Sequence, residues 1–161
     1  MQQLTKIHSV DEQISISGVV VYGRQKGREL GFPTANVNAD ARWLESGVYG
    51  VYVTLNGKKY QGVMNIGVKP TYGSTLTKTI EVHILDFYGD IYGESVECQL
   101  LFKIREEQKF SSIERLKQQI IEDIQYAHQK FKHHEDFIKK NRELSKKEKR
   151  LISQIYSYLM W

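Results

Sequence analysis

The chain has 161 residues, a length typical of one domain whose core is large enough to fold without disulfides. Hydrophobic residues make up 40% and charged residues 26% of it, the composition of an ordinary globular protein. Its apolar runs are short and its first residues lack a signal-peptide profile, so the sequence predicts neither a membrane span nor secretion. The single cysteine, Cys98, excludes an internal disulfide and is typical of a reducing compartment, which favours a cytoplasmic protein.

The positive charge is concentrated at the C-terminal end. The chain has a net charge of +4, but residues 130–161 hold nine Lys/Arg against four Asp/Glu, a net +5. Residues 1–129 are therefore left with a net −1. The basic character belongs to the tail and gives no reason to expect nucleic-acid binding by the rest of the chain.

The first two thirds of the chain have the alternating pattern and β-branched content of strands. The pair Asn56-Gly57 accepts positive φ at both positions of a two-residue turn and predicts a hairpin. Five or six short strands separated by glycine-rich turns favour a small closed barrel or a sandwich. The expected strands cover residues 14–22, 47–55, 59–67, 79–87 and 95–104.

The period of the apolar residues changes to that of a helix after the last expected strand. From Ile113 to Phe131 they recur in steps of three and four, which places them on one helical face. Ser111 and Glu114 have the spacing of a capping box, so we expect the helix to start at Ser111 and to pack on the strands.

The tail contains a second helix signal, because Ser145 and Glu148 again have capping-box spacing. We therefore expect a first domain over residues 1–130 and a basic helical extension over residues 131–161. The extension could pack on the first domain or on a second copy, or it could be a basic arm that contacts RNA or another polyanion. A membrane-surface helix is disfavoured because Glu148 and Gln154 interrupt its faces.

Three glycines, Gly23, Gly27 and Gly31, follow the first expected strand. Glycines let a backbone bend tightly and let its N–H groups approach a phosphate, and Arg28 adds positive charge to the same segment. The spacing matches neither the Walker A motif nor the dinucleotide fingerprint. From the residues alone, a glycine-rich turn is the simpler interpretation.

Pro33 restricts the backbone of the segment that follows, in which Thr34 and Asn36 stand two residues apart. In an extended segment these two side chains project to the same side. Two neutral oxygen ligands side by side can hold a hard cation such as Mg²⁺, with phosphates and water completing its coordination. The alternative is a pair of polar residues at a strand edge that bond a loop.

Glu81 lies in the middle of an apolar strand segment, with His83 on the same face. A carboxylate in this position must face solvent, a cation or a site, and it could act as the general base for a hydroxyl nucleophile. The polar face of a half-buried strand would have the same pattern. Arg105 stands in a short charged segment after the last strand, which is either plain surface or a source of ligand contacts.

Taken together, these segments resemble the riboflavin kinase (flavokinase) family, either a monofunctional member or the kinase domain of a bacterial bifunctional riboflavin kinase/FAD synthetase. The resemblance covers roughly residues 16–127. It is carried by GRELGFPTAN, GVYGVYV, GVMNIGVKPTYG, EVHILDFYGDIYGE and FKIREEQKF, in the family's order. It implies a mainly β fold, a six-stranded antiparallel Greek-key barrel with a long C-terminal helix packed on it. It also implies Mg²⁺-dependent transfer of the γ-phosphoryl of ATP to the 5′-hydroxyl of riboflavin, giving FMN and ADP.

The resemblance also implies roles for individual residues. Glu81 matches the catalytic carboxylate that accepts the proton of the ribityl hydroxyl, and Thr34 and Asn36 match the ligands of the Mg²⁺-nucleotide. The other matched positions are Gly23 and Arg28 in the nucleotide loop, Ile84, Asp86 and Tyr92 along the nucleotide, and Arg105, Gln108 and Phe110 in a flap that closes on the flavin.

Many bacterial relatives carry an adenylyltransferase domain before the kinase. Only about 15 residues precede the expected barrel here and no His-x-x-His signature occurs, so we expect this chain alone to stop at FMN. We expect a monomer or weak dimer that acts on small molecules and not at a membrane. The alternative function is a flavin-binding regulator of flavin gene expression whose basic tail contacts RNA. Binding alone would not need Glu81, so its presence favours the kinase.

Overall fold

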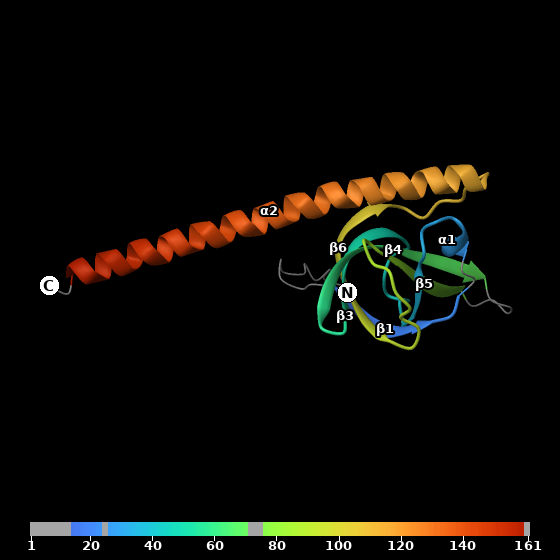
Figure 1. Cartoon of the computed structure of the whole chain (residues 1–161), viewed down its shortest axis with the longest axis horizontal. Helices are drawn as coiled ribbons and strands as arrows, with labels where there is room; N and C mark the ends of the chain where they lie inside the picture. Colours follow the sequence, from blue (N-terminus) through green and yellow to red (C-terminus); the bar gives the residue numbers. More distant parts are fainter. Residues whose placement is uncertain (1–13, 24–25, 71–75, 160–161) are drawn as a thin grey trace, which may run out of the picture. The chain divides into compact units, whose positions relative to one another are not determined.

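The structure is a computed structural model that describes residues 14–23, 26–70 and 76–159 (Figure 1). Its contacts divide the chain into two compact units, residues 1–127 and 128–161, and the boundary falls inside helix α2 (Ile113–Leu159). The first unit contains all the strands and the short helix α1 (Lys26–Glu29). The second unit consists of the remaining part of α2, and each unit is described by itself below.

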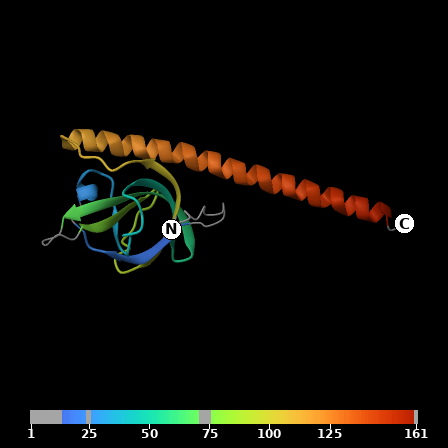
Figure 2. The ribbon, with the colours of Figure 1, turned by 180° about the vertical axis from the view of Figure 1, so that it is seen from behind.

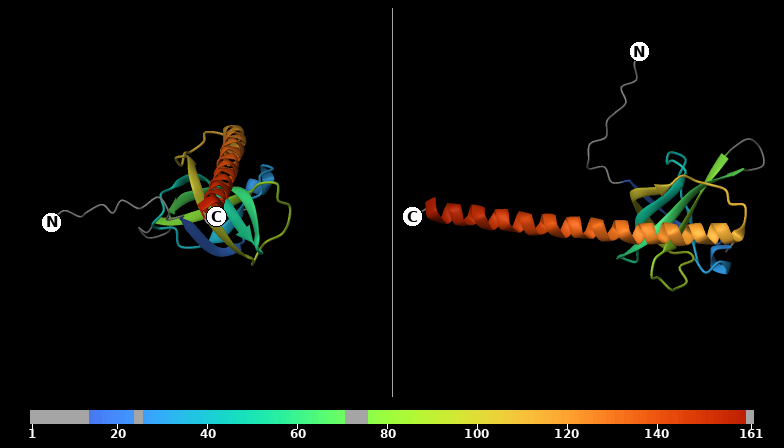
Figure 3. Two further views of the ribbon diagram at one scale, coloured as in Figure 1. Left: turned by 90° about the vertical axis from the view of Figure 1, so that its left-hand side faces the viewer. Right: turned by 90° about the horizontal axis from the view of Figure 1, so that it is seen from above.

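Six antiparallel strands close into a barrel in the order β1-β2-β5-β4-β3-β6. They are β1 (Ser15–Val21), β2 (Ala35–Asn38), β3 (Gly47–Leu55), β4 (Lys58–Pro70), β5 (Leu76–Ile84) and β6 (Ser95–Arg105). The strands surround one interior from every side, as Figure 2 and Figure 3 show from other directions. The six-stranded barrel that the resemblance implied is therefore confirmed, and a two-sheet sandwich is excluded.

Side chains that alternate along the strands fill the interior of the barrel. In β3 the inward residues are Tyr49, Val51, Val53 and Leu55, which form one face of the predicted alternation. Cys98 of β6 is completely buried among these side chains, and burial raises the pKa of its thiol to about 12. The thiolate is the reactive form of cysteine, so the buried Cys98 thiol contributes to the packing of the core and is not a reactive group.

The hairpin between β3 and β4 forms at the predicted turn. Asn56 and Gly57 have φ values of 48° and 75°, the left-handed region that an Asn-Gly pair tolerates. Leu55 pairs with Lys58 directly across the turn, and the register then continues to Gly47 opposite Ile66. This turn therefore fixes which β4 residues face the core.

Helix α2 begins one residue later than the sequence analysis predicted. The hydroxyl of Ser112, not Ser111, accepts a hydrogen bond from the backbone N–H of Arg115 over 3.3 Å. Glu114 lies in the first turn, where hydrogen bonds from its own backbone N–H and from Ser112 lower the pKa of its carboxyl group. A carboxylate there is stabilised by the positive end of the helix dipole. Two adjacent serines offered alternative caps, and spacing alone selected the wrong one.

The second unit is one uninterrupted helical segment, so the predicted start of another helix at Ser145 is wrong. Residues 128–159 contain neither glycine nor proline, and Ser145 is exposed within the helix. A Ser-x-x-Glu spacing caps a helix only where the chain leaves helical geometry, and nothing in this sequence makes it do so. Among the described residues, no helix has the apolar length that a membrane span requires.

Candidate functional site

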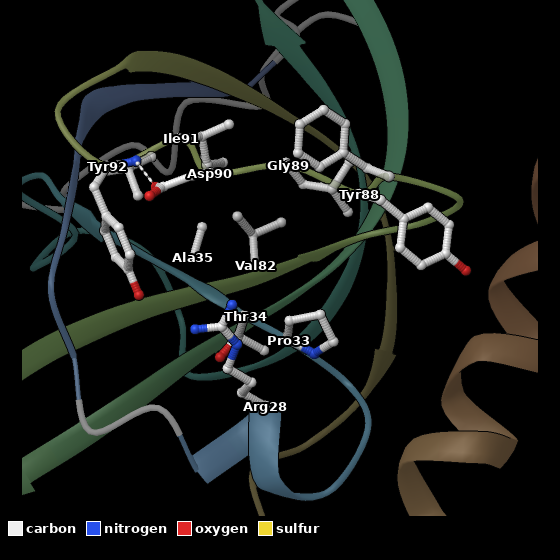
Figure 4. A pocket seen from close by; sticks show the side chains of 13 residues that line it. Arg28, Pro33, Thr34, Ala35, Val82, Tyr88, Gly89, Asp90, Ile91 and Tyr92 are labelled. Carbon is white, nitrogen blue, oxygen red and sulfur yellow. Dashed lines mark hydrogen bonds between the residues drawn. The ribbon is translucent and has the colours of Figure 1, made fainter.

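A cavity of about 500 Å³ opens at one end of the barrel, beside the segment that connects β5 to β6. Figure 4 shows Arg28 reaching up from α1, with the 88–92 segment on the other side of the cavity. Four of the eleven predicted site residues, Arg28, Thr34, Ile84 and Tyr92, line it. The rest of its lining is Val20, Pro33, Ala35, Val82, Phe87, Tyr88, Gly89, Asp90 and Ile91.

The lining of this cavity combines aromatic and aliphatic walls with one strong cation. Tyr92 stacks on Tyr22, with ring centroids 3.9 Å apart and planes at 23°. The carboxylate of Asp90 accepts a hydrogen bond from the backbone N–H of Tyr92 over 3.1 Å, which holds this turn in place. Flat apolar walls next to the Arg28 guanidinium suit a ligand that has a planar ring at one end and an anionic group at the other.

Gly23 lies directly against Asn36, and Gly27 lies near Thr34. A Cβ atom on Gly23 would lie 2.0 Å from Nδ2 of Asn36, and one on Gly27 would lie 3.1 Å from Oγ1 of Thr34. Such distances leave no room for a side chain at Gly23. The segment also forms the single helical turn α1, where the sequence favoured a plain turn. The glycines therefore bring backbone into contact with the two candidate metal ligands.

Glu81 lies on the outer surface of the barrel, in a row of residues paired across neighbouring strands. It pairs with Asn36 of β2 on one side and with Asn65 of β4 on the other. Asn65 pairs with Val48 of β3, which in turn pairs with Arg105 of β6. Paired residues in an antiparallel sheet point to the same face, so this outer row joins Asn36, Glu81 and Arg105 across five strands.

His83, on the same strand face as Glu81, contacts the segment that begins at Phe32. Its Nδ1 lies 2.7 Å from the carbonyl oxygen of Pro33, and its ring meets that of Phe32 edge-on at 6.0 Å. His83 thereby ties the start of the Pro33–Asn36 segment to β5. Through this contact it fixes the segment that carries Thr34 and Asn36.

Arg105, Gln108 and Phe110, the three residues matched to the flavin flap, lie together but do not line the cavity. The guanidinium of Arg105 forms a bidentate ion pair with the buried carboxylate of Asp123 on α2, with two N–O distances of 2.9 Å. It also lies 5.6 Å from the centre of the Phe110 ring.

A second cavity of about 480 Å³ lies between the start of α2 and residues 106–112, the flap segment. Gln108 and Phe110 line it with several polar residues of the first helical turns. Glu107 anchors the same segment to the barrel, since its carboxylate accepts a 3.4 Å hydrogen bond from the backbone N–H of Val68. Gln108 of the segment donates to the side chain of Gln119 on the helix over 3.1 Å.

Besides Glu81, Arg105, Gln108 and Phe110, three more predicted site residues do not line the first cavity. Gly23 and Asn36 lie against each other at its side, next to Glu81 in register. Asp86 is exposed in the turn after β5, where it has a left-handed φ of 53°. Such a backbone is unusual for a residue other than glycine and is often found near functional sites.

Sequence analysis missed Asp123, Gln119 and Tyr22. Asp123 was detectable in principle, because it stands between Ile120 and Ala127 on the apolar face of the helix. A carboxylate on a face that packs against a core needs a partner, which turned out to be Arg105. Tyr22 stacks on Tyr92, which is 70 positions away in the chain. No short stretch of the sequence could therefore indicate this contact.

The oxygen atoms around the glycine segment fit Mg²⁺ better than a transition metal. Thr34 and Asn36 supply a hydroxyl and an amide oxygen, and glycine backbone packs directly against both side chains. Within the described part of the chain, no three His, Cys, Asp or Glu side chains group as metal ligands. A cation held by few protein ligands is typical of Mg²⁺, which keeps water and phosphate oxygens in its coordination shell.

Comparison with curated proteins gives relatives over the barrel and the first part of α2. The RNA-binding riboflavin kinase RibR of Bacillus subtilis (strain 168) is 57% identical over 116 residues, which are 72% of this chain and 50% of that protein. The bifunctional riboflavin kinase/FMN adenylyltransferase of the same organism is 40% identical over 116 residues, 70% of this chain and 37% of that protein. The chain thus spans half or less of the length of these relatives.

Comparison with solved structures gives the same fold. The riboflavin kinase from Trypanosoma brucei matches with a TM-score of 0.57 and 26% identity, over 77% of this chain and 83% of that one. The model of the family described as "Flavokinase: Riboflavin kinase" matches residues 10–131, which include every predicted site residue. The barrel, its site and these matches together show that the chain belongs to the riboflavin kinase family.

Proposed function

We propose that this chain is a riboflavin kinase that transfers the γ-phosphoryl of ATP to the 5′-hydroxyl of riboflavin, forming FMN and ADP. The observation that carries the proposal is the register of β2 and β5. It pairs Glu81 with Asn36, and Gly23 packs against the Asn36 side chain while Gly27 lies near Thr34. Phosphoryl transfer requires a base, ligands for a metal ion and backbone that can approach phosphate closely.

The first cavity is the proposed nucleotide site. Its aromatic and aliphatic walls, which include Tyr92 and Ile84, would hold the adenine ring. Arg28 would neutralise phosphate charge at the opposite side, beside Thr34. The roles of Gly23 and Asp86 in nucleotide binding stay predictions, because neither residue lines the cavity.

Thr34 and Asn36 are the proposed Mg²⁺ ligands. When bound, the cation would neutralise charge on the polyphosphate and orient the γ-phosphoryl group. The protein's own contribution is to hold the two side chains in place. Gly23 packs against Asn36, and His83 ties the preceding Pro33 carbonyl to β5.

Glu81 is the proposed general base. Its carboxylate accepts the proton of the riboflavin 5′-hydroxyl as the hydroxyl oxygen forms a bond to the γ-phosphorus. The bond between this phosphorus and the β–γ bridging oxygen breaks, and ADP leaves with the electron pair. Removal of the proton makes the oxygen a stronger nucleophile, so no covalent enzyme intermediate is needed.

The activity is tested by incubating the chain with riboflavin, ATP and Mg²⁺ and separating the flavins by chromatography. We expect FMN to accumulate and no FAD to form. Absence of FMN at enzyme concentrations comparable to substrate would reject the kinase function. Tight flavin binding in the same sample would then favour the regulatory alternative.

The Asn36→Ala variant is expected to require more Mg²⁺, because it removes one of the two proposed ligands. The Mg²⁺ concentration for half-maximal FMN formation should rise at least about tenfold, the scale on which even outer partners of a metal site act. Asn38→Ala is the matched control, since Asn38 is exposed two residues further along β2 and pairs with Val19. If both variants have the wild-type Mg²⁺ titration, the metal assignment is wrong.

A second candidate function, RNA binding, is favoured by the charge pattern of the second unit and by the chain's similarity to RibR, which is named an RNA-binding riboflavin kinase. Steps of seven, three and four place five exposed cations on one side of this helical segment: Lys132, Lys139, Arg142, Lys146 and Arg150. The exposed apolar residues Phe137, Leu144 and Leu151 lie on the opposite side. A row of cations on one helix face suits a phosphate backbone.

RNA binding is tested by gel shift with the leader RNA of a flavin-pathway gene over a range of salt concentrations. We expect the logarithm of the binding constant to fall linearly with the logarithm of the salt concentration. Replacing the five cations by Gln should remove the shift and leave FMN formation unchanged. No binding at low salt would exclude this candidate.

A further inference from the structure

Asp123 of α2 is the one polar or charged side chain that is buried in the described part of the chain, with a side chain only 5% exposed. Both of its oxygen atoms accept hydrogen bonds. Nε and Nη2 of Arg105 donate over 2.9 Å, and Nε2 of Gln119 donates to Oδ1 over 3.1 Å. A buried carboxylate with all of its bonds satisfied has one stable orientation and imposes it on its partners.

The partners of Asp123 continue the network into the flap segment. Oε1 of Gln119 accepts a hydrogen bond from Nε2 of Gln108 over 3.1 Å. Arg105 donates from Nη1 to the carbonyl oxygen of Glu106 over 3.0 Å, and its guanidinium lies 5.6 Å from the Phe110 ring centre. Three residues of the flap segment are therefore held by two side chains that Asp123 orients.

Burying an ion pair seldom stabilises a protein more than apolar side chains of the same size would. The Arg105–Asp123 pair therefore calls for an explanation other than stability. The pair joins residues 18 positions apart and sets the direction of Arg105 where the chain leaves β6 for the flap segment. A fixed orientation of ligand-binding groups is the benefit that such a pair offers.

We propose that Asp123 and Gln119 are positioning residues for the flavin, acting through Arg105 and Gln108 and touching neither substrate. The proposal rests on the kinase function, with riboflavin bound against the flap segment. None of the four residues lines the first cavity, the proposed nucleotide site. Loss of the network should therefore weaken the use of riboflavin and leave the use of ATP unchanged.

The first test is Gln119→Leu, which removes the link between Asp123 and Gln108 and keeps the Arg105–Asp123 pair. We expect the KM for riboflavin to rise about fivefold, the effect of one hydrogen bond, with the KM for ATP unchanged. Gln118→Leu is the matched control. Gln118 is the neighbouring glutamine, and it bonds Glu122 over 3.1 Å in the same helix. Equal KM values for riboflavin in the two variants would overturn the role of Gln119.

The second test is Asp123→Asn, which keeps the size of the side chain and removes its charge. The KM for riboflavin should rise about thirtyfold, because hydrogen bonds to charged groups are the stronger ones. A purely structural role would lower the melting temperature and the active fraction, with both KM values unchanged, and that result would overturn the proposal. Asp123→Glu keeps the negative charge. If that charge orients Arg105, the KM for riboflavin should lie between the values of Asp123→Asn and the wild-type chain.

Hydrogen exchange of residues 106–110 separates failure of this proposal from failure of the kinase function. If the wild-type chain forms no FMN, the kinase function is wrong, and the network is then judged by exchange alone. We expect these amides to exchange faster in Gln119→Leu than in Gln118→Leu. Equal exchange in the two variants would show that the network does not hold the flap segment.

Discussion

The Glu81→Gln variant is expected to form FMN more than about a hundredfold more slowly than the wild-type chain, the range over which a general base acts. The substitution keeps the shape of the side chain and its position between Asn36 and Asn65. It replaces the charged carboxylate by a neutral amide, which cannot accept a proton at neutral pH. The measurement is the turnover number at saturating riboflavin and ATP, where binding differences do not contribute.

Glu97→Gln is the matched control for this prediction. Glu97 is an exposed glutamate within β6, between Ser17 and Thr54 of the neighbouring strands, so the same change is made elsewhere on the barrel surface. We expect this variant to keep wild-type turnover. If Glu81→Gln also keeps near-normal turnover, Glu81 is not the base, and its carboxylate serves only the polar surface of β5.

The Gly23→Ala variant is expected to lose about tenfold to a hundredfold in kcat/KM for Mg²⁺-ATP, because small displacements of positioned groups have effects of this size. The added methyl group would lie 2.0 Å from Nδ2 and 2.4 Å from Cγ of Asn36, so the amide must move away. The atoms that must shift belong to the end of a side chain, and the barrel should keep its stability. The measurement is steady-state kinetics with Mg²⁺-ATP as the varied substrate.

A double variant shows whether Gly23 acts through Asn36. If the methyl group does harm only by displacing the amide, Gly23→Ala/Asn36→Ala should be no worse than Asn36→Ala, and the two effects should not add. If they do add, Gly23 has a separate role, such as backbone contact with phosphate. Strong destabilisation of Gly23→Ala, seen in its melting temperature, would contradict the assumption that Asn36 can move aside.

Local patterns in the sequence were enough to predict most of the barrel. The alternation in β3 and the Asn56-Gly57 turn each depend on neighbouring residues alone, and the structure confirms both. The errors occurred where one pattern is compatible with two structures. A serine followed three residues later by an acid is a cap only where a helix starts, so Ser145 was misjudged.

The candidate site was less predictable because it depends on pairing between distant strands. The sequence could suggest a role for Asn36 and another for Glu81, but only the register of β2 and β5 makes them direct neighbours. Likewise, the sequence suggested a role for Arg105 but not its ion pair with Asp123. In the sequence, Asp123 looks like any charged residue on a helix surface, and only the structure shows that it is buried. Strand register and helix rotation are set by the whole core, which no short segment encodes.

The outer row from Asn36 to Arg105 has a consequence for substrate selection. Strands lie about 4.8 Å apart, so the three intervals from Glu81 to Arg105 separate these two residues of the row by about 14 Å along the barrel surface. Such a spacing is a property of the backbone and does not change with side-chain rotamers. With the flavin ring near the flap segment, as proposed, a base at Glu81 would reach only a hydroxyl at the matching distance along the sugar chain. A flavin whose chain is one carbon shorter would be held equally well and phosphorylated poorly.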